Sequence, residues 1–180
     1  MSKLIWRVAD GRERIGTTLT MPPGYDTAAE KDVLSIPLTT MSGTGMVDAS
    51  SYLAKAGTKL QPTASTKVTE GVLNSPVEFE LPGLKKFEGN FSVLRPFDVD
   101  TDDIDATLDV LFTQIGEDNI TFYAYKRLGK LGTVPWAVGD EGYVYECLTD
   151  VAIEQPEQNQ ATQATVPLSV ISRRAFKITS

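Results

Sequence analysis

Histidine is absent from this 180-residue chain, and cysteine occurs once, at Cys147. Without histidine the chain lacks the usual general base near neutral pH and the commonest nitrogen ligand for zinc, copper or non-haem iron. A nucleophilic triad of the usual kind is excluded, and no Gly-x-Ser-x-Gly sequence occurs. We therefore expect no catalytic residue, no cofactor and no metal ligand, and we predict that the protein is not an enzyme.

Long apolar runs are also missing. No window of about 18 apolar residues is found, and the N-terminal sequence MSKLIWRVADGRER has no sustained apolar stretch. Neither a signal peptide nor a membrane span is predicted, so we expect a protein made in the cytoplasm with no membrane partner. The lone Cys147 cannot form an intrachain disulfide. It lies in the apolar run 143–153, where a small buried side chain is favoured over a reactive thiol.

Basic residues are fewer than acidic ones. The chain has 17 basic and 24 acidic side chains, a formal net charge of -7, whereas proteins that grip nucleic acid neutralise phosphates with clustered Lys and Arg. Specific DNA binding is therefore not expected. The hydrophobic and charged fractions, 41% and 23%, are typical of a globular protein. A chain of this length fits one domain, 1–180, that buries roughly 70% of its unfolded surface.

The first third of the chain has few strand signals. Residues 1–31 mix charges, threonines and the turn-forming Pro22-Pro23-Gly24, which predicts an irregular N-terminal arm. Residues 32–41 predict a strand that Pro37 confines to an edge or a bulge. Residues 42–66 are rich in Gly, Ser, Thr and Ala, with only a short helical possibility at 48–56, and predict a long surface loop.

The remaining residues, 67–178, predict a β core. Apolar alternation and β-branched or aromatic runs indicate strands at 66–70, 76–81, 87–95, 119–127, 143–154 and 162–174. The runs ITFYAY and VPLSVI are apolar on both faces, which suits strands covered on one side by a helix or second sheet and on the other by a further element, which could be another subunit. The predicted fold is mainly β (α+β): an antiparallel β-sandwich or open barrel with one flanking α-helix.

That helix is predicted at about 102–115. Thr101 or Asp102 is a candidate N-cap, acidic residues lie near the positive end of the helix dipole, and Gly116 supplies a left-handed stop. The expected buried stripe has the i, i+4, i+7, i+8, i+11 spacing of one helix face. Its members are Ile104, Leu108, Leu111, Phe112 and Ile115.

Two acidic patterns have a chemical as well as a structural interpretation. Asp98, Asp100, Asp102 and Asp109 copy the spacing of a calcium-binding EF-hand loop. However, Asp103 stands where the loop needs glycine, and capping of the helix is the favoured interpretation. Glu78 and Glu80 could in principle act as acid and base, but at i, i+2 on a strand they predict a solvated polar face.

The order of these segments resembles the major tail (tail tube) proteins of long-tailed phages, especially those that infect actinobacteria. The similar stretches run from PTASTKVTEGVLNSPVEFELPGLKKFEGNFSVLRPFD through DDIDATLDVLFTQIG and NITFYAYKR to PWAVGDEGYVYECLTDVAIEQPEQNQATQATVPLSV, within residues 32–178. The resemblance implies six-subunit rings that stack into a hollow tube, with the sheets of neighbours joined around the lumen. It also implies that residues 42–66 and the N-terminal arm bridge stacked rings.

The same resemblance implies the partners and the location. The chain would bind itself, a tape-measure protein, and tail terminator and distal tail proteins, and viral DNA would pass without specific binding. It would assemble in the host cytoplasm and reside in the tail of the virion. An acidic wall would repel the DNA phosphates, although screening limits this field to about 8 Å at physiological salt. As a hypothesis, Glu78, Glu80 and Glu88 face the lumen.

Other classes stay open at this point. A head-decoration or baseplate protein, or the tube subunit of a contractile injection system, would also be a self-associating virion component. From a different class, a β-barrel that binds a small ligand, or a histidine-free enzyme, would need a closed pocket with convergent polar groups. For a tube subunit we expect 1–31 and 42–66 to be disordered in the free monomer, because ordering costs about 1–2 kcal/mol per residue until neighbours compensate for it.

Overall fold

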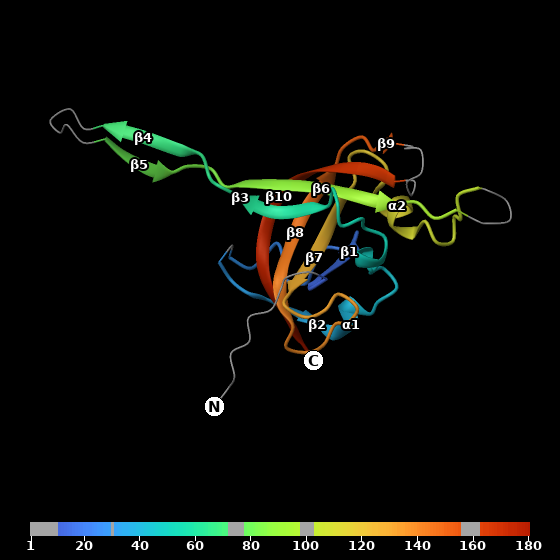
Figure 1. Cartoon of the computed structure of the whole chain (residues 1–180). Helices are drawn as coiled ribbons and strands as arrows, with labels where there is room; N and C mark the ends of the chain where they lie inside the picture. Colours follow the sequence, from blue (N-terminus) through green and yellow to red (C-terminus); the bar gives the residue numbers. More distant parts are fainter. Residues whose placement is uncertain (1–10, 30, 72–77, 98–102, 156–162) are drawn as a thin grey trace.

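The computed structural model describes residues 11–29, 31–71, 78–97, 103–155 and 163–180, and Figure 1 shows their arrangement. The described part is dominated by strands, with three short helical segments. The strands are β1 Glu13–Thr18, β2 Leu34–Pro37, β3 Lys59–Thr63, β4 Lys67–Gly71, β5 Glu78–Pro82, β6 Lys86–Leu94, β7 Thr121–Leu128, β8 Glu141–Thr149, β9 Ile153–Gln155 and β10 Gln163–Thr179. The helical segments are α1 Leu38–Met41, the 3-10 helix η1 Ala49–Ser51 and α2 Val110–Ile115.

The main sheet has eight strands in the order β1-β7-β8-β10-β6-β3, and β2 and β9 also pair with β10. All of these pairs are antiparallel except β2–β10. The first part of β10 pairs with β6 and β9, and its later part pairs with β8 and β2. A bulge between Val170 and Ser172 lies near this change of partners. The sheet is not closed, which confirms the predicted open, mainly antiparallel β fold with a helix.

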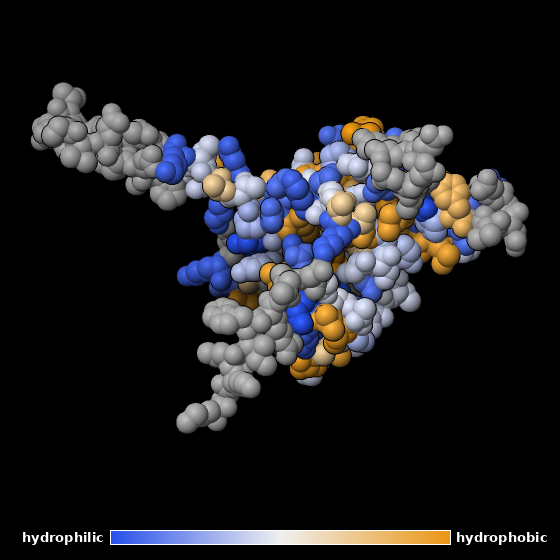
Figure 2. Space-filling model, viewed as in Figure 1, coloured by the Kyte–Doolittle hydropathy of each residue, from blue (hydrophilic) through white to orange (hydrophobic). Residues whose placement is uncertain are grey.

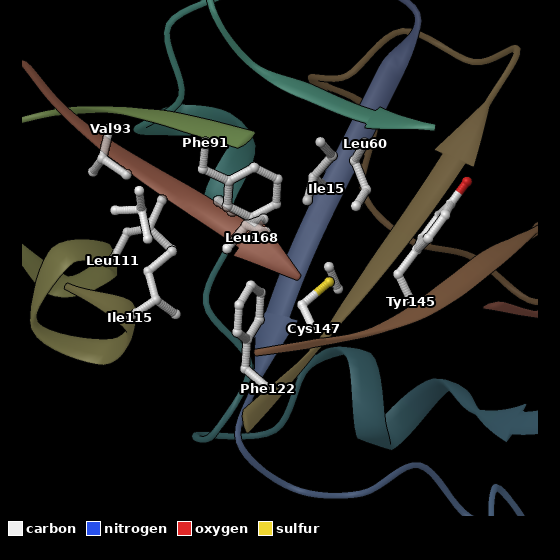
Figure 3. Packing of buried hydrophobic residues seen from close by; sticks show 13 residues of the cluster. Ile15, Leu60, Phe91, Val93, Leu111, Ile115, Phe122, Tyr145, Cys147 and Leu168 are labelled. Atoms are coloured by element: carbon white, nitrogen blue, oxygen red, sulfur yellow. The ribbon is translucent and has the colours of Figure 1, made fainter. Parts of the chain in front are cut away.

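The larger hydrophobic cluster packs one face of β7 and β8 against β3, β6 and α2 (Figure 3). Phe122 and Cys147 point into it from the main sheet, and Phe91 faces Phe122 with ring centroids 6.0 Å apart. Full burial of a large apolar side chain stabilises the fold by roughly 1.5–3 kcal/mol, so this cluster is a major source of stability. Cys147 is fully buried, as predicted, and burial raises the pKa of its thiol.

A second cluster covers the opposite face of the same strands. Tyr123 and Tyr125 of β7 alternate with Phe122 and Ala124, so they point to the other side of the sheet. Their cover is supplied by the chain itself, from Tyr25 and from the segment 34–41 that contains β2 and α1. The prediction that both faces are covered is therefore confirmed for the run ITFYAY of β7, where the chain itself supplies the cover. In the run VPLSVI of β10, Ser169 and Ile171 are exposed, so cover of that face by another subunit stays a prediction.

The predicted irregular arm, 1–31, is wrong for its described part. β1 pairs with β7 along its whole length, and Ile15 and Thr17 are buried. Tyr25 also belongs to the core, where its hydroxyl lies 2.5 Å from that of Ser172. The sequence ERIGTT has one large apolar residue, so it lacks the alternation that marks a strand. The strand forms because its backbone pairs with β7 at the edge of the sheet. Residues 1–10 and 30 lie outside the described residues.

The predicted long loop, 42–66, is wrong at 59–63, which form a strand of the main sheet, and the rest of it is tied to the body. It contains η1 and β3, with Ala49 and Leu60 buried in the larger cluster. Val47 forms an antiparallel bridge with Thr17, and Leu53 forms another with Val93. Composition misled the prediction because single apolar residues anchor these turns, and small polar residues between them bond to neighbouring strands, as Ser50 Oγ accepts from the N–H of Ile15 in β1 at 2.6 Å.

The predicted helix 102–115 is confirmed only in its last part, because α2 begins at Val110. Asp105 competes with the helix: its Oδ1 accepts hydrogen bonds from the backbone N–H and the hydroxyl of Thr107, a turn that replaces helical pairing. Ile104 and Leu108 of the expected stripe are consequently exposed. The helix ends as predicted, although Gly116 has φ -77 rather than a left-handed value. The N-cap candidates Thr101 and Asp102 lie outside the described residues.

Arg95, directly after β6, links α2 to the sheet. Its guanidinium bonds to Asp109, with 2.7 Å between Nη2 and Oδ2, and to Glu154, with 2.8 Å between Nη1 and Oε1. It also lies 3.7 Å from the ring centroid of Phe112. These contacts fix the beginning of α2 against β6 and the β9 region.

Candidate assembly surfaces

The described residues contain no group of three or more His, Cys, Asp or Glu side chains that could hold a metal ion. Asp109, one of the calcium-type residues, is held by Arg95, while Asp98, Asp100 and Asp102 lie outside the described residues. Within the part of the chain that the structure describes, no helix is long and apolar enough to cross a membrane. The features that remain are surfaces suited to protein contacts.

The most prominent of these is the hairpin of β4 and β5, which projects from the body (Figure 1). The two strands form a separate two-stranded sheet with a register that places Lys67 opposite Pro82 and Gly71 opposite Glu78. A two-stranded hairpin is marginally stable in water, and both of its strands have an open edge. The hairpin is therefore a strong candidate for contact with another protein.

The root of this hairpin is the pair of segments 64–67 and 83–86, which join it to β3 and β6. The Gly83 N–H donates to the Thr66 carbonyl over 2.5 Å, and a Cβ at Gly83 would lie 2.7 Å from that oxygen. Glycine therefore allows the two segments to approach closely. Next to it, Leu84 is 81% exposed and is followed by Lys85 and Lys86, and Lys67 lies on the other segment of the root, opposite Pro82.

The opposite end of the molecule carries α2 and β9, and apolar side chains gather there (Figure 2). A groove of about 310 Å³ lies between α2 and the segment before β9, with Phe112, Gly116, Val151 and Ala152 in its lining together with acidic residues 117, 118 and 154. Large apolar side chains around α2 and β9 are exposed. They are Phe97, Ile104, Leu108, Val110, Val151 and Ile153.

A second groove, of about 520 Å³, lies at the end of the sheet where β7 ends and β8 begins. Val33, Leu128, Tyr143 and Ala175 give it an apolar lining. Its charged lining residues pair with each other, since Lys177 Nζ lies 2.8 Å from Glu141 Oε1. The groove therefore has an apolar surface with little net charge.

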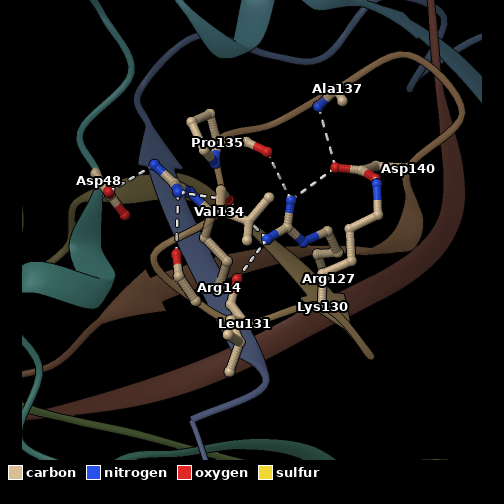
Figure 4. A network of polar contacts seen from close by, with 10 residues as sticks. Arg14, Asp48, Arg127, Lys130, Leu131, Val134, Pro135, Ala137 and Asp140 are labelled. Atoms are coloured by element: carbon tan, nitrogen blue, oxygen red, sulfur yellow. Dashed lines mark hydrogen bonds and ion pairs between the residues drawn. The ribbon is translucent and has the colours of Figure 1, made fainter.

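The loop between β7 and β8 is fixed by two arginines (Figure 4). Arg127 donates to the carbonyls of Leu131, Val134 and Pro135 and to Asp140 Oδ2 over 2.7 Å. Arg14 of β1 donates to the carbonyls of Gly132 and Val134 from the other side. Its Nη2 also lies 2.7 Å from Asp48 Oδ2. The loop is therefore held in a defined shape by these bonds.

The structure places the three candidate lumen glutamates in two sheets. Glu78 and Glu80 belong to β5 of the hairpin, whereas Glu88 belongs to β6 of the main sheet. Glu88 bonds to Lys59, with 2.6 Å between Oε1 and Nζ, and this hydrogen bond lowers its pKa. Sequence reasoning found the strands of the hairpin but missed its exposed root. The signal was the sequence PGLKK, in which an apolar residue follows a turn and precedes two lysines.

Comparison with known families matches residues 27–175 to the family described as phage tail tube protein. A search of the curated proteins finds no match. The family match covers the described sheet except β1 and the last residues of β10, together with the hairpin, α2 and the α2 groove. Because this match spans well over half of its length, the chain belongs to the phage tail tube protein family.

Proposed function

We propose that this structural component of a phage tail assembles into rings of six subunits, which stack into the hollow tube through which viral DNA is delivered. Membership of the family supports a tail component that associates with itself. The observation that carries the proposal is the projecting β4–β5 hairpin, which pairs with no other described strand of its own chain. Identical copies offer such an element a partner at every position of a ring or stack.

The hairpin takes the bridging role between stacked rings that the resemblance implied for residues 42–66 and the N-terminal arm. Ala49 and Leu60 anchor that segment in the larger cluster, and Val47 and Leu53 tie it to neighbouring strands, so it does not project from the body as the hairpin does. The hairpin root instead presents Leu84 to solvent, and its strands have open edges. We therefore assign the contact between stacked rings to the hairpin, and the contacts within a ring to the body.

The proposed DNA passage and partners follow from a hollow tube. Viral DNA would cross the lumen without specific binding, because a chain with a net charge of -7 offers few sites for phosphate. A tape-measure protein would occupy the lumen before delivery, and tail terminator and distal tail proteins would close the ends. Long-tailed phages, including those of actinobacteria, are the proposed source, with assembly in the host cytoplasm.

Electron microscopy of the purified protein tests this proposal. At high protein concentration we expect hollow filaments of uniform diameter with six-fold end-on views. Rings of another symmetry would contradict the hexamer but keep the tube. A protein that stays monomeric at every concentration and salt condition, also when tail components that could nucleate it are added, would contradict the proposed function itself.

A further inference from the structure

We propose that the hairpin root of one copy docks in the groove beside α2 of the next copy, with Leu84 as the apolar anchor. The hairpin root is 64–67 with 83–86, and the α2 groove is the one lined by Phe112, Gly116, Val151 and Ala152. The proposal rests on the proposed self-association and names the pair of surfaces that produces it. The partner is a second copy of this chain.

The positions of the two surfaces support a head-to-tail contact. The hairpin leaves one side of the body, and α2 and β9 lie on the opposite side (Figure 1). An interface between two different surfaces of identical copies repeats, and it produces rings or open helical stacks. Two surfaces on the same side would instead favour a closed pair, which cannot extend into a tube.

Both the hairpin root and the α2 groove present exposed apolar side chains. Leu84 is 81% exposed, the highest value among the exposed large hydrophobic side chains of the described residues. In the α2 groove, Val151 is 63% exposed. Exposed apolar side chains that gather in one area mark sites of protein contact. A groove of about 310 Å³ has room for a leucine side chain.

Charge complementarity favours the α2 groove, rather than the groove beside β8, as the docking site of the hairpin root. The hairpin root carries three lysines, 67, 85 and 86, together with Leu84. The α2 groove is rimmed by Glu117 and Asp118, which are both exposed, and Asp150 lies next to its lining residue Val151. Opposite charges at a rim guide the approach of partners and disfavour wrong registers. The groove beside β8 has no excess of negative charge, because its Glu141 and Lys177 pair with each other.

The groove is also held in shape before any partner arrives. Phe112 is covered by the guanidinium of Arg95, which bonds to Asp109 before α2 and to Glu154 of β9. On the other side of the groove, Thr149 accepts from the N–H of Ile120 through its Oγ1 and donates to the Glu117 carbonyl over 2.6 Å. A preformed site binds with less loss of side-chain freedom, which favours docking.

Charge reversal on each side, followed by their combination, tests the docking. The variants Lys85→Glu with Lys86→Glu, and Glu117→Lys with Asp118→Lys, are each expected to raise the protein concentration needed for tube assembly by at least about tenfold. The chain that carries all four changes is expected to recover assembly. Lys31→Glu with Lys177→Glu is the matched control, since it changes the net charge by the same amount as the first variant. Circular dichroism checks that every variant is folded.

Cross-linking gives a second readout that does not depend on complete tubes. A tagged Leu84→Cys protein is mixed with a differently tagged Val151→Cys protein under a mild oxidant such as oxidised glutathione. We expect disulfide-linked heterodimers, while the buried Cys147 stays unreactive. A Leu19→Cys protein replaces Leu84→Cys in the control mixture, because Leu19 is exposed and follows β1, at the other end of the strand order from β3 and the root.

The outcomes separate the docking from the proposed function. Tubes that form normally from both charge-reversed pairs, or tubes without the Leu84–Val151 cross-link, would overturn the docking and leave the tube function standing. The absence of both tubes and cross-link in otherwise folded protein would overturn both. Recovery of assembly in the four-fold variant, together with the specific cross-link, would support the docking.

Discussion

At the scale of residues, the buried ion pair of Arg127 and Asp140 determines the shape of the β7–β8 loop. Arg127 is the largest of the fully buried side chains, and Nη1 lies 2.7 Å from Asp140 Oδ2. Asp140 also accepts hydrogen bonds from Lys130 and from the N–H of Ala137. Burial alone would raise the pKa of Asp140, but the bonds from Lys130, Arg127 and Ala137 outweigh it, so the pKa is lowered.

We predict that Asp140→Asn lowers the free energy of unfolding by about 3 kcal/mol at pH 7, because the buried charge of Arg127 then lacks its partner. The folded-state pKa of Asp140 is depressed, so its contribution is complete above the ordinary value of about 4 and is lost as the pH falls through the folded-state pKa. The difference between the two proteins should therefore shrink in acid. Urea unfolding at several pH values measures it.

Glu141→Gln is the matched control for this change. Glu141 is the next residue and also has a basic partner, Lys177, but both side chains are more than half exposed. Exposed pairs contribute roughly 0–1 kcal/mol, so the control should change stability little at any pH. Equal losses for the two substitutions would contradict the structural role assigned to Asp140.

At the scale of elements, the strands with clear apolar patterns could be predicted, and the elements anchored by single residues could not. The sequence predicts β6, β7, β8 and β10 because aromatic and β-branched residues follow one another there. It misses β1 and β3, where one large apolar residue each, Ile15 and Leu60, is buried and the neighbouring strand supplies the pairing. Local propensity carries little information about such edge strands.

The helix predicted at 102–115 shows a different limit of prediction from sequence, namely competition between a helix and a local turn. The spacing of Ile104 and Leu108 fits a helix face, yet Asp105 and Thr107 form a turn whose hydrogen bonds compete with helix formation. The capture of Asp109 by Arg95 depends on a residue 14 positions earlier in the chain, which periodicity does not reveal. The α2 groove was missed for the same reason, since its two walls come from separate segments, 112–118 and 151–154.

Removal of the hairpin tests its role as an assembly element. Thr63 of β3 pairs with Lys86 of β6, so a two-residue Asn-Gly turn can replace residues 64–85 and close the two strands. We expect the protein to stay folded, with a melting temperature within a few degrees of the original, because the hairpin contributes little to the two clusters. We also expect it to form no tubes in electron micrographs.

A shorter replacement is the control. Gly71 pairs with Glu78, so Asn-Gly in place of residues 72–77 keeps both strands and the whole hairpin root. This variant should assemble, because Leu84 and its lysines are retained. Tubes from the protein without its hairpin would show that the body alone is sufficient for assembly.

At the scale of the whole molecule, the acidic side chains of the subunit would determine the charge of the tube's inner wall. If Glu78, Glu80 and Glu88 face the lumen, as we propose, their reversal to Lys should leave tubes intact and slow or block DNA ejection from phage particles. Reversal of Glu78 and Glu80 alone should give most of the effect, since Glu88 is already paired with Lys59. The effect should weaken at high salt. Ejection at the original rate would argue against the lumen assignment.

The position of β10 in the sequence affects how the protein is made. All the strands that pair with β10, namely β2, β6, β8 and β9, are synthesised before it, and β10 links them into one sheet. Until residues 163–179 have left the ribosome, these strands lack their common neighbour and leave edges unpaired. Sheets formed from distant segments also fold slowly. The growing chain is therefore exposed to premature association, and a competent subunit exists only after β10 has been inserted.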